Sequence, residues 1–346
     1  MKKERKSYID VIKILAVFLV CFAHSGSSGS SAFYASVGIT QIIQTTIFVI
    51  CIKSVPLFFM CTGALLLLKE EGIRQLWVKR VIRYIVLIVV FTTLYYVCLS
   101  IRNQTPVDIL FILKTMYNTW GYSHSGSYWF LYYYVGFLML LPLLRMIAKG
   151  LDNKMITYMI IVNTVMCSVL PIVESWLGME NVAVKVELIT ADVFFYPFLG
   201  CYIEKSDFKE IFTPKNIVGL LVMSIVSLVT SVSYSISYIQ MGIYTDEYYE
   251  LFQLYVVMFV YIMAKWLNGK FVLNERVLKV LTEVSNCTFG IYLIHGVIYM
   301  LVDDLLVAKG VVFTYPIAWL RAGMVFSISL ICVWICRKIP GIKRLF

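Results

Sequence analysis

Hydrophobic residues form ten long runs along the chain, separated by short polar segments. A helix that crosses a bilayer needs about 20 mainly apolar residues, so the pattern predicts an all-α, polytopic integral membrane protein with about ten transmembrane helices. The predicted spans are 8–26, 40–68, 80–101, 127–147, 155–173, 188–203, 216–238, 248–267, 284–306 and 316–336. Because no long polar stretch interrupts them, we expect a single transmembrane domain over residues 1–346.

Composition and charge agree with a membrane protein and orient it. The chain is 60% hydrophobic and 14% charged, whereas a soluble domain is about 25% charged. Of the 30 Lys and Arg, 23 lie in the terminal segments and the alternate loops that share one side. The positive-inside rule makes that side, with both termini, cytoplasmic. The net charge of +10 therefore reflects membrane orientation, and we expect no nucleic-acid partner.

Cysteine and histidine usage indicates neither a disulfide framework nor a metal site. None of the nine cysteines forms a CxxC pair, and the three histidines are scattered. The basic N-terminus resembles that of a signal peptide, but its apolar run continues to His24 without a small-residue cleavage pattern. We therefore expect a retained first helix.

The first predicted helix carries three ionisable residues: Asp10, Lys13 and His24. Lys13 and His24 are separated by about three helical turns, so they share one face and lie about 16 Å apart along the axis. Asp10 is close enough to Lys13 to pair with it. These side chains either reach toward the headgroups or form a functional polar stripe. A stripe that ends in histidine suits proton transfer near neutral pH.

The stretch IDVIKILAVFLVCFAH (9–24) resembles the opening helix of the acyltransferase-3 family of membrane O-acyltransferases, in which an acidic residue and an arginine precede a histidine. Lys13 takes the place of the usual arginine, which keeps the charge but loses the bidentate geometry. Four further matches follow in the family's order: SVPLFFMCTGALLL (54–67), VKRVIRY (78–84), GSYWFLYYYVGFLMLLPLL (126–144) and CTFGIYLIHGVIY (287–299). Segments 54–67 and 126–144 most resemble the surface-polysaccharide O-acetyltransferase branch.

The resemblance implies a multi-pass enzyme of the cell membrane, surrounded by membrane lipids, with acetyl-CoA as co-substrate and no permanently bound cofactor. His24 would be the general base or would carry the acyl group transiently, while Lys13, held by Asp10, would stabilise thioester or phosphate charge. Arg80 and Arg83 would bind the phosphates of coenzyme A at the cytoplasmic entrance. Without the resemblance, this pair is an ordinary positive-inside cluster.

Other polar residues in the spans are candidates for the substrate site. Lys53, near Pro56, supports an oxyanion, pairs with an acid or reaches the outer surface. His295 is either a substrate contact or a packing residue. The remaining candidates are an Asp192–Arg321 pair and the acceptor-facing residues Trp120, Tyr122, His124 and Trp129. The last group alternatively belongs to an interfacial aromatic belt.

The leading hypothesis is transfer of an acetyl or similar short acyl group from cytoplasmic acyl-CoA to a hydroxyl of a cell-surface polysaccharide or its lipid-linked precursor. A glycan or lipid transporter without acyl-transfer chemistry is the alternative, and the absence of a detectable repeat weighs against it. A membrane sensor is a third class. Thioester consumption by the purified protein distinguishes the enzyme from the other two.

The basic loops predict the membrane orientation of the C-terminus. A reporter fused to Phe346 should be active when it requires the cytoplasm and inactive when it requires export. Activity only outside the cell would contradict the ten-span arrangement.

Overall fold

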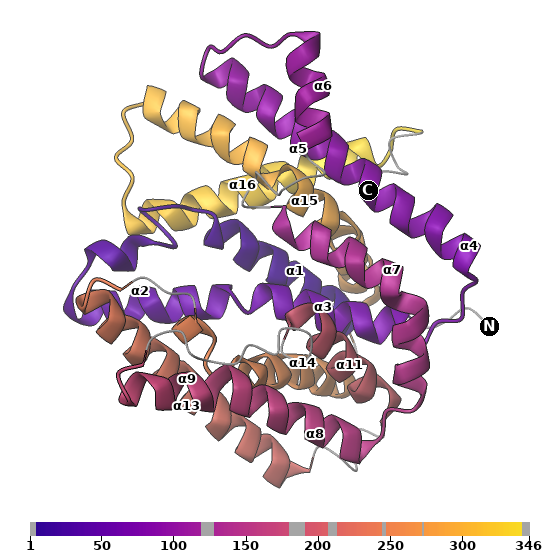
Figure 1. Ribbon diagram of the computed structural model, residues 1–346. Helices are drawn as coiled ribbons and strands as arrows, with labels where there is room; N and C mark the ends of the chain where they lie inside the picture. The colour runs from indigo at the N-terminus through magenta and orange to yellow at the C-terminus, as the bar shows by residue number, and fades with distance from the viewer. Residues whose placement is uncertain are drawn as a thin grey trace.

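The computed structural model describes residues 5–118, 128–179, 191–206, 213–243, 247–271 and 273–340. These residues form helices and no strand, as the hydrophobic pattern predicts (Figure 1). Within them, 7 helical stretches are long and apolar enough to cross a membrane. They are Gly38–Leu66, Ile73–Arg102, Trp129–Lys149, Asn153–Trp176, Pro214–Gln240, Glu275–Ala308 and Tyr315–Cys336. The count of ten spans and the cytoplasmic position of the termini stay predictions.

In its described residues, each of the ten predicted spans overlaps helix. The helices are α1 Ser7–Ala23, α2 Gly38–Cys51, α3 Ser54–Leu66, α4 Ile73–Leu76, α5 Ile82–Arg102, α6 Ile109–Asn118, α7 Trp129–Lys149, α8 Asn153–Thr164, α9 Leu170–Trp176, α11 Asp192–Lys205, α13 Pro214–Gln240, α14 Gln253–Lys270, α15 Glu275–Ala308 and α16 Tyr315–Cys336. Short turns are η1 Ala32–Ala35 and η4 Glu247–Glu250, and π-helical turns are η2 Trp77–Val81 and η3 Val165–Val169.

Local sequence explains several helix boundaries. The side chains of Asp152, Thr213 and Asn274 accept backbone N–H groups in the first turns of α8, α13 and α15, which satisfies donors that have no partner within the helix. The predicted span 40–68 is divided into α2 and α3, with Lys53 between them and Pro56 in the first turn of α3. Proline lacks the amide N–H that a continuous helix would use there.

Helix α1 lies at the centre of the bundle, in contact with α2, α3, α14, α15 and α16 (Figure 1). Its buried residues include Ile9, Ile12, Ala16 and Val20, which recur at helical spacing and place one face in the core. Lys13 in this helix is partly buried among its neighbours, whereas His24, the residue that follows the helix, is accessible.

Helix α11 packs directly against α3 through glycine. A Cβ atom at Gly63 would lie 1.9 Å from the carbonyl oxygen of Pro197, and one at Gly200 would lie 2.1 Å from that of Met60. Only glycine permits such an approach of two backbones, as in other membrane helix pairs. This contact holds the N-terminal end of α11, with Asp192, beside the first turns of α3.

We predict that Gly200→Ala lowers the thermal stability of the purified protein, because the new methyl group meets the backbone of α3. Overpacking typically costs about 1–3 kcal/mol. Gly219→Ala is the matched control, since a Cβ at Gly219 in α13 meets no atom within 4 Å. Thermal unfolding in detergent measures both variants, and equal midpoints would contradict the close contact.

Candidate functional site

Three adjoining cavities run through the described part of the bundle. The first, of about 330 Å³, contains Lys13, Arg80 and Arg83, and we call it the cationic pocket. The second, of about 270 Å³, contains His24 and is called the histidine chamber. The third, of about 970 Å³, lies against α7 and α11 and is called the aromatic groove.

Shared wall residues connect the three cavities in a row. Phe130 and Tyr292 line both the cationic pocket and the histidine chamber. Trp129, Asp192 and Glu250 line both the histidine chamber and the aromatic groove. His24 therefore lies in the middle cavity, between a basic cavity and a largely apolar one.

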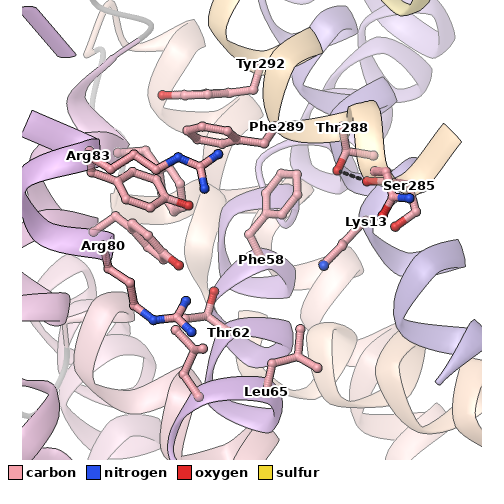
Figure 2. A pocket seen from close by; sticks show the side chains of 15 residues that line it. Lys13, Phe58, Thr62, Leu65, Arg80, Arg83, Ser285, Thr288, Phe289 and Tyr292 are labelled. Atoms are coloured by element: carbon pink, nitrogen blue, oxygen red, sulfur yellow. Dashed lines mark hydrogen bonds between the residues drawn. The ribbon is translucent and has the colours of Figure 1, made fainter. Parts of the chain in front are cut away.

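The cationic pocket brings basic residues together from two sides. Lys13 comes from α1, whereas Arg80 and Arg83 come from η2 and α5, and their charged ends converge on the same space (Figure 2). Within the described ranges, neither Lys13 nor Arg83 forms an ion pair, and the buried Nε of Arg83 has no hydrogen-bond partner. Partly buried cations without an ionic partner favour an anionic ligand.

Arg80 differs from Arg83 because Glu71 neutralises it. The Nε of Arg80 donates to Glu71 Oε2 at 3.0 Å, and Arg145 contacts the same oxygen at 3.3 Å. Burial of the Glu71 side chain raises its pKa, but hydrogen bonds from Arg80 and Arg145 and the charge of Lys69 outweigh this and hold it below the ordinary value. Glu71 thus stays ionised and fixes Arg80 at the pocket wall.

The expected pairing of Asp10 with Lys13 is wrong. Asp10 instead accepts two hydrogen bonds from Arg5, at 2.7 and 2.9 Å, and one from Ser285 Oγ at 2.6 Å. Arg5 competes successfully because its guanidinium matches the carboxylate bidentately. Asp10 therefore connects the start of α1 to α15, and Lys13 is left to face the pocket.

One hydrogen bond of His24 defines which ring nitrogen carries the hydrogen in the neutral form. The Nδ1 atom lies 2.9 Å from the carbonyl oxygen of Val20. Because a carbonyl only accepts, Nδ1 carries the hydrogen and Nε2 of the neutral ring keeps its lone pair. His24 follows the last residue of α1 and is accessible from the histidine chamber. Its Nε2 can accept a proton from a group in that cavity.

The chain around His24 is held by contacts from distant helices. Tyr299 Oη in α15 donates to the carbonyl of Cys21 at 2.6 Å, and Ser25 Oγ donates to that of Phe22 at 2.6 Å. Arg321 in α16 donates to the carbonyl of Ser25 at 3.2 Å and forms a bidentate pair with Asp303. Arg321 thus pairs with Asp303 and not with Asp192, the partner that the sequence left as a possibility.

His295 lies behind His24 rather than in a cavity wall. The two ring centroids are 4.9 Å apart, and His295 is fully buried. Its Nδ1 lies 2.6 Å from the carbonyl of Tyr292, while its Nε2 has no hydrogen-bond partner in the described part of the chain. A direct substrate contact by His295 stays a prediction. In the structure its ring packs beside that of His24.

Trp129 lines the histidine chamber, whereas Lys53 is not among its lining residues. Lys53 is buried, and its Nζ donates to the backbone carbonyl of Tyr249 at 2.7 Å. It thereby holds the segment that carries Glu250, and it does not reach the outer surface. Trp129, the first residue of α7, lines the chamber and the groove directly.

Sequence reasoning missed the acid Glu250 in the wall of the histidine chamber. Its position in the acidic and aromatic stretch TDEYYE (245–250), directly before an apolar run, was the available signal. Asp192 was recognised as an intramembrane charge with Arg321 as a possible partner; in the structure Gln253 Nε2 donates to it at 3.3 Å. The candidates Trp120, Tyr122 and His124 lie outside the described residues.

A protein-family model covers nearly the whole chain. The model of the acyltransferase-3 family, described as an acyltransferase domain, matches residues 6–338. The match includes α1 with His24, the basic residues of the cationic pocket and both acids of the histidine chamber. No curated protein and no solved structure matches the chain. With nearly its whole length covered by the family model, the chain belongs to the acyltransferase-3 family of membrane acyltransferases.

Proposed function

We propose that the protein transfers an acetyl or similar short acyl group from cytoplasmic acyl-CoA to a hydroxyl of a cell-surface polysaccharide or of its lipid-linked precursor. The family supports acyltransferase activity in general. The observation that carries the proposal further is the row of cavities, which joins a pocket with unpaired cations to the chamber of His24.

The donor enters the cationic pocket. Lys13 and Arg83 bind phosphate groups of coenzyme A, and Arg80 contributes from the position at which Glu71 holds it. The pantetheine arm passes Phe130 and Tyr292, the residues shared by both cavities. The thioester carbonyl then lies in the histidine chamber, beyond the charged part of the donor.

His24 performs the proton transfer. Its Nε2 accepts the proton of the acceptor hydroxyl while the oxygen attacks the thioester carbonyl. The tetrahedral intermediate collapses, the carbon–sulfur bond breaks, and the proton on Nε2 passes to the leaving thiolate. The products are the acyl ester and free coenzyme A. A covalent acyl-histidine route would use the same nitrogen and would show ping-pong kinetics instead of a ternary complex.

The unpaired cations should control donor affinity. Lys13→Met and Arg83→Ala should each raise the KM for acyl-CoA about tenfold or more, because a charge-assisted hydrogen bond to phosphate is lost. Lys13→Arg should retain most of the activity. Lys79→Ala is the control, since it removes a neighbouring positive charge that is exposed and outside the pocket. An unchanged KM in both pocket variants would eliminate the phosphate role.

His24 should control chemistry. His24→Ala should reduce acyl transfer by about 10²–10⁴-fold, the usual contribution of a general base, while the protein still inserts and accumulates. Wild-type activity should also fall as acidification protonates the imidazole, since only the neutral ring accepts a proton. Release of free thiol from acyl-CoA by purified protein measures both effects. A well-expressed His24→Ala protein with the wild-type rate would refute the assignment.

A further inference from the structure

The aromatic groove follows one face of α7. Its α7 lining residues recur at helical spacing: Trp129, Tyr132, Tyr133, Gly136, Phe137, Leu140 and Leu144. A stripe of this length extends about 22 Å along the helix axis. Phe59 of α3 and the start of α11 complete the wall. The groove therefore offers a long, narrow apolar surface rather than a rounded pocket.

The groove opens toward the surroundings of the bundle. Leu140 is 48% exposed, Tyr133 is 55% exposed and Trp129 is 40% exposed. These side chains belong to a helix that is long and apolar enough to cross a membrane. The environment of such exposed apolar groups is lipid hydrocarbon. A ligand that enters between α7 and α11 must therefore carry an apolar part.

The character of the wall changes at the end that meets the histidine chamber. There, Asp192 and Glu250 stand with Trp129 in the wall shared by the two cavities. Carboxylate oxygens accept hydrogen bonds from hydroxyl groups, and an aromatic ring packs on the apolar face of a sugar. One end of the groove thus suits a hydroxyl-rich head and the rest suits a hydrocarbon chain.

We propose that the acceptor is lipid-linked and reaches His24 sideways from the bilayer. Its hydrocarbon chain lies in the aromatic groove along α7, and its hydroxylated head binds Asp192 and Glu250 in the wall of the histidine chamber. This inference rests on the proposed function and chooses the lipid-linked precursor over the free polysaccharide. Donor and acceptor then approach His24 through different cavities and occupy the protein together.

Gly136 provides a direct test, because a Cβ atom there meets no atom within 4 Å. Because Gly136 lines the groove, Gly136→Phe places a ring there, starting from a Cβ position that no other atom approaches. Gly219→Phe is the matched control, a helix glycine in α13 that is equally free of neighbours and outside the groove. The probe is dodecyl maltoside with a photoreactive diazirine on its alkyl chain, applied to the protein in lipid nanodiscs.

We expect the label on residues 129–144 of α7 and on the start of α11. Gly136→Phe should reduce this labelling about tenfold, which corresponds to loss of the contacts of about two methylene groups. Excess unlabelled dodecyl maltoside should compete, and maltose should not. Labelling that Gly136→Phe leaves unchanged, or that is spread equally over α13, would overturn the lipid-linked acceptor.

Kinetics separates this inference from the proposed function. With an acceptor that supports turnover, Gly136→Phe should raise the KM for the acceptor about tenfold and leave the KM for acyl-CoA unchanged. Equal effects on both constants would overturn the acceptor role of the groove. Specific labelling without any acyl transfer would retain the groove as a lipid-linked ligand site and refute the acyltransferase proposal.

Discussion

The site depends on the hydrogen bonds that the carbonyl groups at the C-terminal end of α1 accept. A helix leaves its last carbonyls without intrahelical partners, and inside a membrane bundle no bulk water replaces them. Here His24 itself, Tyr299 and Ser25 occupy the carbonyls of Val20, Cys21 and Phe22. The capping contacts therefore also set the orientation and tautomer of the histidine. The same hydrogen bonds thus end the helix and position the site residue.

A second constraint is the cost of charge in a medium of low polarity. Asp10 is paired with Arg5, and Arg321 with Asp303. Neither pair leaves a net charge, and the Arg321–Asp303 pair also joins α16 to α15. Lys13 and Arg83 are exceptions, since they face a cavity without an ionic partner in the described part of the chain. An uncompensated charge is stable there only with water or an anion beside it, and the cavity provides the space for either.

Much of the fold was predictable because a membrane helix can be recognised from one short apolar stretch of sequence. The ten apolar runs overlap helices in the described residues, and Lys13 and His24, expected on one face from helical spacing, line two adjoining cavities. Side-chain partners were less predictable, because they join segments far apart in sequence. Asp10 has a lysine three residues away, yet it binds Arg5, five residues before it, and Ser285, which only the packing of α1 against α15 brings near. Likewise, nothing near Glu250 in sequence indicates that Lys53 holds its neighbour Tyr249.

The order of the cavities has a consequence for how such a reaction avoids loss of the acyl group to water. A phosphate-bearing donor is soluble in water, whereas the aromatic groove opens among apolar side chains. If the acceptor enters through the groove, its hydrocarbon chain excludes water from that side, and the bound donor occupies the other side. Water then has access to His24 chiefly when one substrate is missing. Since a hydroxyl of the acceptor and a water molecule are equally acceptable to the Nε2 atom, exclusion of water has to come from occupancy of the two neighbouring cavities rather than from the base.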